Sequence, residues 1–100
     1  MSDEPVACSL GDGAAIAQRL DEWQALLATS RERHAIDGGV RVTFAGGADV
    51  AAEVAALAAA EVECCRWIDF SLLIDADQTT LEARATAEEG QALLVSLFCD

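Results

Sequence analysis

The sequence predicts an α+β fold, a two-layer sandwich in which helices pack on a small, mostly antiparallel sheet; one form of it is a ferredoxin-like arrangement. Two observations lead to this fold class. Some stretches repeat apolar residues every three or four positions, as amphipathic helices do, and others alternate apolar with polar residues, as half-buried strands do. These stretches follow one another in the order α-β-α-β-β-α, which favours helices on a small sheet.

The first predicted helix runs from about residue 12 to residue 33. Its apolar residues at helical spacing are Ile16, Leu20, Trp23 and Leu27. Asp12 is a suitable N-cap, and His34 is expected in the solvated turn at the other end. Gly38 and Gly39 then interrupt the chain, and Val40, Val42 and Phe44 alternate with polar residues as the first strand.

The second half repeats these two patterns. A second helix is expected over about residues 49–66, with Asp49 as its cap. Strands over 68–74 and 80–86 are joined by a turn at 75–78, and a last helix covers about 87–98. A three-stranded sheet leaves an edge free to pair, so a homodimer is one expectation.

Length and composition bound the function. One hundred residues form one domain, here an N-terminal segment over 1–11 and an α+β domain over 12–100. The formal net charge of −12, with 18 acidic residues against six arginines, argues against direct binding to nucleic acid or to an anionic membrane. No apolar run is long enough for a membrane span, and the acidic N-terminus lacks the features of a signal peptide.

A cytoplasmic location is therefore expected, and in that compartment cysteines are thiols rather than structural disulfides. Cys64 and Cys65 stand at the predicted end of the second helix, and Glu61 shares their face because it lies one turn earlier. Cys8, from the N-terminal segment, is the natural third ligand, with Cys99 as another candidate. Clustered thiolates suit mercury(II), arsenic(III), copper(I), cadmium or zinc, so the cluster predicts a soft metal or metalloid site.

Two other interpretations of these cysteines remain open. They can be small hydrophobic residues of the core, in which case the domain is an interaction or dimerisation module. They can also serve thiol redox or nucleophilic chemistry, although the negative end of a helix and the nearby Glu61, Glu63 and Asp69 disfavour a reactive thiolate and only Arg66 opposes them. An enzyme is the less favoured class.

Three segments carry a resemblance to a known family: ACSL, RLDEWQALL, and the run from EVECCRWIDFSLLI through LEARATAEEGQALLVSLF. They resemble a small actinobacterial-type domain found alone or appended to regulators of the mercury-resistance (MerR) type. Its pattern is Cys-Ser-Leu, then Arg-x-x-Glu-Trp, then Glu-x-x-Cys-Cys-x-aromatic-x-x-Phe. The matching residues are Cys8, Arg19, Glu22, Trp23, Glu61, Cys64, Cys65, Trp67 and Phe70.

The resemblance implies metal sensing, sequestration or delivery in heavy-metal resistance, with a regulator or other protein as partner. The chain has no helix-turn-helix pattern and no basic patch, so an accessory role fits better than operator binding. Trp23 and Trp67 are expected mainly in the core, and a pocket for an organic ligand between them is the alternative. Arg19 and Glu22 are expected to form a surface ion pair.

Overall fold

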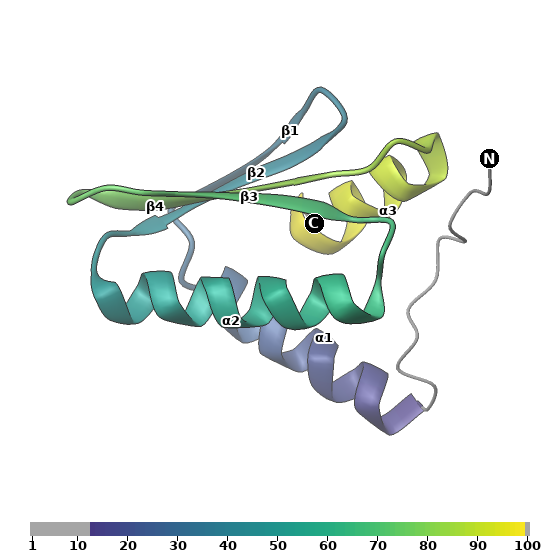
Figure 1. Cartoon of the computed structure of the whole chain (residues 1–100), viewed down its shortest axis with the longest axis horizontal. Coiled ribbons are helices and arrows are strands. Elements are labelled where there is room, and N and C mark those ends of the chain that lie inside the picture. The colour runs from purple at the N-terminus through teal and green to yellow at the C-terminus, as the bar shows by residue number, and fades with distance from the viewer. Residues whose placement is uncertain (1–12, 100) are drawn as a thin grey trace.

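The computed structural model describes residues 13–99 and has an α+β architecture, which confirms the predicted fold class (Figure 1). The elements in chain order are α1 (Gly13–Leu27), β1 (Glu32–Ile36), β2 (Gly39–Ala45), α2 (Ala48–Cys64), β3 (Asp69–Ile74), β4 (Gln78–Arg84) and α3 (Glu88–Cys99).

The four strands form one antiparallel sheet in the order β1-β2-β4-β3. Strands β2 and β3 are therefore parallel to each other, with β4 inserted between them, and α2 connects them. This is a split β-α-β unit, the unit of ferredoxin-like folds. The remaining strand, β1, lies at the edge of the sheet beside β2, and a hairpin joins these two strands.

All three helices lie on one side of the sheet (Figure 1). Alternation along the central strands explains this layering, because Val40, Val42 and Phe44 of β2 and Leu81 and Ala83 of β4 are buried toward the helices. The core is completed from the helices by Leu26, Val54, Leu94 and Phe98. No helix within residues 13–99 covers the opposite face of the sheet, which carries mostly polar side chains.

The first helix was predicted too long: it ends at Leu27 and not near residue 33, and the residues that follow form strand β1. The hydroxyls of Thr29 and Ser30 donate to the carbonyls of Leu26 and Leu27 at 2.7 and 2.6 Å, and so satisfy the end of the helix. The predicted order therefore lacked one strand.

The other predicted elements are confirmed within two residues; the third predicted strand, expected over 80–86, is shifted by two residues to Gln78–Arg84. At the β3–β4 turn, Oδ1 of Asp75 accepts from the backbone N–H groups of Asp77 and Gln78 at 2.8 and 2.9 Å. Asp49 was predicted as the N-cap of α2, but the N-cap is Gly47 and Asp49 lies in the first turn of the helix. Asp12 lies outside the described residues.

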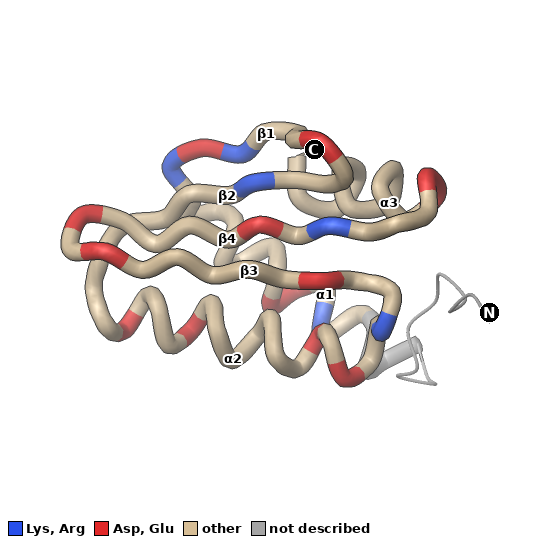
Figure 2. The backbone as a smooth tube through the Cα atoms, turned by 45° about the horizontal axis from the view of Figure 1, so that its top comes forward, with Lys and Arg blue, Asp and Glu red and all other residues tan. Residues whose placement is uncertain are grey.

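Charge is distributed unevenly over these layers. Three of the six arginines, Arg33, Arg41 and Arg84, lie on strands of the sheet, whereas acidic residues recur along α2 and at the hairpin between β3 and β4 (Figure 2). None of the helices in the described part of the chain is long and apolar enough to cross a membrane.

Candidate functional site

The carboxylate of Glu61 is the centre of the cluster that the sequence singles out. Its Oε1 accepts a hydrogen bond from Nε1 of Trp23 at 2.8 Å and from Nη1 of Arg19 at 3.3 Å. Its Oε2 accepts from Sγ of Cys65 at 3.0 Å. One acidic side chain of α2 thus joins helix α1 to the cysteine pair.

Helix α1 contributes two of these donors because Arg19 and Trp23 are four residues apart and share a face. The Arg19 side chain is only 18% exposed and also lies 3.5 Å from Oε1 of Glu22. Its Nη1 is 3.8 Å from Sγ of Cys64. Burial alone would lower the pKa of Arg19, but the contacts with Glu61 and Cys64 outweigh it, so the pKa is raised and the guanidinium stays charged.

The two cysteines differ in backbone position and burial because α2 ends between them. Cys64 is the last helical residue, and Cys65 is the C-cap, with φ −121° and ψ 84°. The N–H of Cys65 still donates to the carbonyl of Glu61 at 2.7 Å, so the turn stays closed. Cys65 points into the core and is 4% exposed, whereas Cys64 is half-buried beside Arg19. The sulfur of Cys64 therefore contacts Arg19, and the sulfur of Cys65 contacts Glu61, so both touch the same ion pair.

Trp23 forms the core-side wall of this cluster. Its ring stacks on Phe70 at a centroid distance of 6.0 Å and meets Phe98 edge-on at 4.9 Å. The expectation of a core residue holds for Trp23, and in addition its N–H serves the site. This satisfies its only polar atom, as buried tryptophan requires.

Trp67 lies in other surroundings. It is partly buried against the core, and its Nε1 is buried with no hydrogen-bond partner among the described residues. Its ring packs so closely on Gly90 that a Cβ there would lie 3.0 Å from it. No ring contact between Trp67 and Trp23 occurs among the described residues. Cys99 is half-buried at the end of α3, where it packs against the core. Cys8 lies outside the described residues.

The donor set can be compared with what a metal ion needs. Within residues 13–99, no group of three or more His, Cys, Asp or Glu side chains is arranged to hold a metal ion. Both oxygens of Glu61 already accept hydrogen bonds, which makes this carboxylate less available as a ligand. The described donors that suit a soft ion are therefore the sulfurs of Cys64 and Cys65, and a third protein ligand would have to come from elsewhere in the chain.

The contact between Arg19 and Cys64 was not predicted. The sequence suggested a surface ion pair of Arg19 with Glu22, and the structure contains that pair together with the buried contacts. The sequence did contain a signal for this contact. Arg19 lies four residues before Trp23, so both side chains are on the face of α1 that packs against the core.

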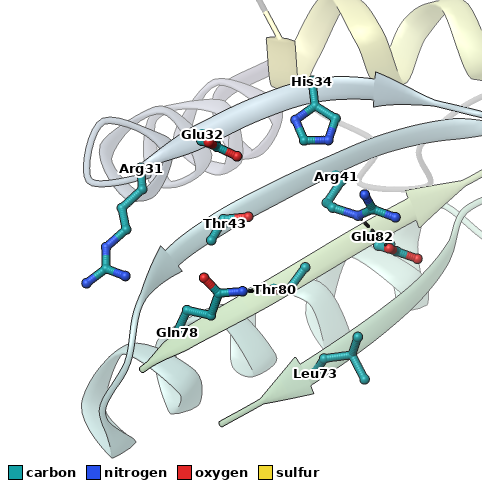
Figure 3. A pocket seen from close by; sticks show the side chains of 9 residues that line it. All are labelled: Arg31, Glu32, His34, Arg41, Thr43, Leu73, Gln78, Thr80 and Glu82. Carbon is teal, nitrogen blue, oxygen red and sulfur yellow. Dashed lines mark hydrogen bonds and ion pairs between the residues drawn. The ribbon is translucent and has the colours of Figure 1, made fainter. Parts of the chain in front are cut away.

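Two grooves are lined entirely by residues that the structure describes. One, of about 500 Å³, lies between α1 and α2. The other, of about 480 Å³, is on the open face of the sheet (Figure 3). It is lined by Arg31, Glu32, His34, Arg41, Thr43, Leu73, Gln78, Thr80 and Glu82. His34 thus lies on a strand of the open face, and its predicted place in a helical turn was wrong.

Glu82 dominates the polar chemistry of the open face. Its two oxygens accept from Nε of Arg41 and Nη1 of Arg84, each at 2.7 Å. These two hydrogen bonds hold the pKa of Glu82 below its ordinary value. Arg41 lies directly opposite Glu82 in the register of β2 and β4, so this pair joins the two strands, whereas Arg84 lies on the same strand as Glu82.

Comparison with known proteins adds no assignment, because no family model, no curated protein and no solved structure matches the chain.

Proposed function

We propose that this domain binds a soft metal or metalloid ion through the sulfurs of Cys64 and Cys65, with Cys8 as a third ligand and Glu61 as a neighbouring carboxylate. The observation that carries the proposal is that both sulfurs contact one ion pair: Sγ of Cys64 lies 3.8 Å from Nη1 of Arg19, and Sγ of Cys65 donates to Oε2 of Glu61 at 3.0 Å. Soft ions prefer thiolates over the oxygen and nitrogen ligands that dominate other protein sites.

Charge balance supports this proposal. Binding a metal ion requires both thiols to lose their protons. Glu61 can accept the proton of Cys65, to which it is already hydrogen-bonded at 3.0 Å, and Arg19 stabilises a thiolate at Cys64. Once Glu61 has passed that proton to solvent, the thiolates of Cys64 and Cys65 beside the Glu61–Arg19 ion pair carry a net charge of −2, which a divalent ion such as mercury(II), cadmium or zinc neutralises. A thiolate of Cys8 would add one further negative charge.

The role of such a site would be sensing, sequestration or delivery. Sequence resemblance to domains appended to mercury-resistance-type regulators supports that range of roles. If Cys8 joins the site, the ion links the N-terminal segment to the end of α2 and changes the surface that a regulator or another protein meets.

Native mass spectrometry of the reduced protein tests the proposal directly. Mercury(II), arsenite, copper(I) and zinc are added in turn, and uptake of one equivalent of at least one ion is expected. The double variant Cys64→Ser/Cys65→Ser should lose that uptake, Cys8→Ser should weaken it, and Cys99→Ser should leave it unchanged. If the wild type takes up none of the four ions, the proposal is wrong.

A second candidate function, homodimer formation, is favoured by a specific observation on β3. This edge strand exposes two adjacent aliphatic side chains, Leu73 at 64% and Ile74 at 61%, and its only charge is Asp69. The other edge, β1, begins with the charged residues Glu32 and Arg33, as protected edges often do. Pairing of β3 with β3 of a second copy would continue the sheet.

Analytical ultracentrifugation tests this candidate. The wild type should sediment as a dimer at high concentration, and Leu73→Lys should sediment as a monomer. Leu93→Lys, which places the same charge at an exposed leucine on α3, is the control and should remain dimeric. A monomeric wild type at every concentration would exclude pairing through β3.

A further inference from the structure

We infer that the ligand of this site is an organic thiophile, a monosubstituted trivalent arsenical R–As(OH)₂, and that the groove between α1 and α2 receives its organic group R. This inference rests on the proposed thiol site and goes further, because it names the class of substrate and a second binding surface.

The groove is large enough and apolar enough for a small organic group. Its volume of about 500 Å³ falls in the range of ligand pockets. Its walls include methyl and isobutyl groups from both helices. The apolar lining residues are Ala25, Leu26, Ala56, Leu57 and Ala60. The charged lining residues are Glu22, Glu53 and Arg19, whose net negative charge disfavours an anionic substituent.

The groove is adjacent to the thiol site along α2. Leu57, Ala60 and Cys64 follow at intervals of three and four residues, so they lie on one face of the helix. Arg19 connects the two from α1, because it lines the groove and its Nη1 also lies 3.8 Å from Sγ of Cys64. A ligand bound to Cys64 therefore has the groove beside it.

The valence of the ligand matches the two described thiols. Arsenic in R–As(OH)₂ keeps one bond to carbon and has two exchangeable hydroxyls. Two As–O bonds break and two As–S bonds form, the two thiol protons leave with the hydroxyls as two molecules of water, and arsenic stays trivalent. The product R–As(S)₂ is three-coordinate and neutral, so it needs no third cysteine. Glu61 can pass the proton of Cys65 to the leaving hydroxyl because it already accepts that hydrogen bond at 3.0 Å.

The test has two parts: binding of arsenicals with different organic groups is compared, and a bulky side chain is placed in the groove to block it. Binding of phenylarsonous acid and methylarsonous acid to the reduced, full-length protein is measured by calorimetry, with arsenite as the probe without an organic group. The wild type is expected to bind the phenyl compound roughly tenfold more tightly than the methyl compound, because the ring buries more apolar area. Ala56→Phe, which places a ring in the groove from an exposed position, should abolish this preference.

Ala55→Phe is the matched control, since it adds the same ring at an exposed alanine 100° further around α2. It should keep the preference for phenyl, and circular dichroism should show that both variants fold. Equal binding of phenyl and methyl compounds by the wild type, or equal effects of the two variants, would overturn the inference while thiol-dependent arsenite or mercury(II) uptake still supports the proposed function. Absence of all uptake would reject both.

Discussion

Trp23 and Glu61 are 38 positions apart in the chain, and a hydrogen bond of 2.8 Å from the indole N–H to Oε1 joins them. The bond ties α1 to the last turns of α2, directly beside the cysteine pair. Since Glu61 also accepts from Arg19 and Cys65, a single carboxylate satisfies three partly buried donors. Stability and the geometry of the thiols therefore depend on the same side chain.

Replacement of this carboxylate should be costly. Glu61→Ala leaves the indole N–H of Trp23 and the guanidinium of Arg19 without their acceptor, and each unsatisfied buried donor costs on the order of 1–3 kcal/mol. We expect the free energy of unfolding to fall by roughly 2–4 kcal/mol in urea denaturation. Glu63→Ala, an exposed acid two residues further along α2, should change it by less than about 0.5 kcal/mol. Equal effects of the two variants would mean that the cluster contributes nothing to stability.

Most of the fold could be predicted because its central elements carry strong periodicity. Val40, Val42 and Phe44 alternate with polar residues, and the structure buries all three in β2. Strand β1 was missed because its sequence, ERHAI, is polar and does not alternate, and its residues are mostly exposed. A signal was nevertheless present: Asp37-Gly38 is a typical hairpin turn, and Gly38 adopts a positive φ of 85°.

The candidate site could be predicted only in part. Glu61, Cys64 and Cys65 were expected to lie together near the end of one helix because their spacing is local, and the structure places Cys64 at the last residue of α2. The partners from α1 could not be assigned, because they depend on how two helices pack. Their crossing brings Arg19 within 3.8 Å of Cys64, although 45 positions separate them.

Gly39 should not tolerate a side chain. A Cβ at this position would lie 1.8 Å from the carbonyl oxygen of Ala83, which is backbone of the neighbouring strand and cannot turn away. Gly39→Ala should lower the free energy of unfolding by about 3 kcal/mol or more. Gly47→Ala is the comparison: a Cβ there meets nothing within 4 Å, and only the φ of 120° opposes it, at a cost of roughly 1–2 kcal/mol. A milder effect at Gly39 than at Gly47 would contradict the observed register of β2 and β4.

Glu82 should make stability depend on acidity. Hydrogen bonds from Arg41 and Arg84 hold its pKa below the ordinary value of 4.5, so on acidification the unfolded chain binds a proton first. Its contribution is complete above the ordinary pKa and is lost as the pH falls through the lower, folded value. Glu82→Gln should therefore cost roughly 1 kcal/mol at pH 7, and the difference from wild type should shrink below about pH 4.5. A difference that is constant down to pH 2 in urea denaturation would contradict this role.

Arg19 should control the reactivity of Cys64. The guanidinium favours a thiolate at 3.8 Å, and Cys64 is half-buried whereas Cys65 is buried, so alkylation at neutral pH should label Cys64 before Cys65. Arg19→Gln should slow labelling of Cys64 roughly fivefold, which corresponds to the loss of about 1 kcal/mol of charge interaction at such a distance in water. Arg66→Gln removes the same charge from an exposed position two residues after Cys64 and should slow it less. Peptide mapping by mass spectrometry identifies the labelled cysteine, and an equal effect of both variants would show that net charge, and not the contact with Arg19, sets the rate.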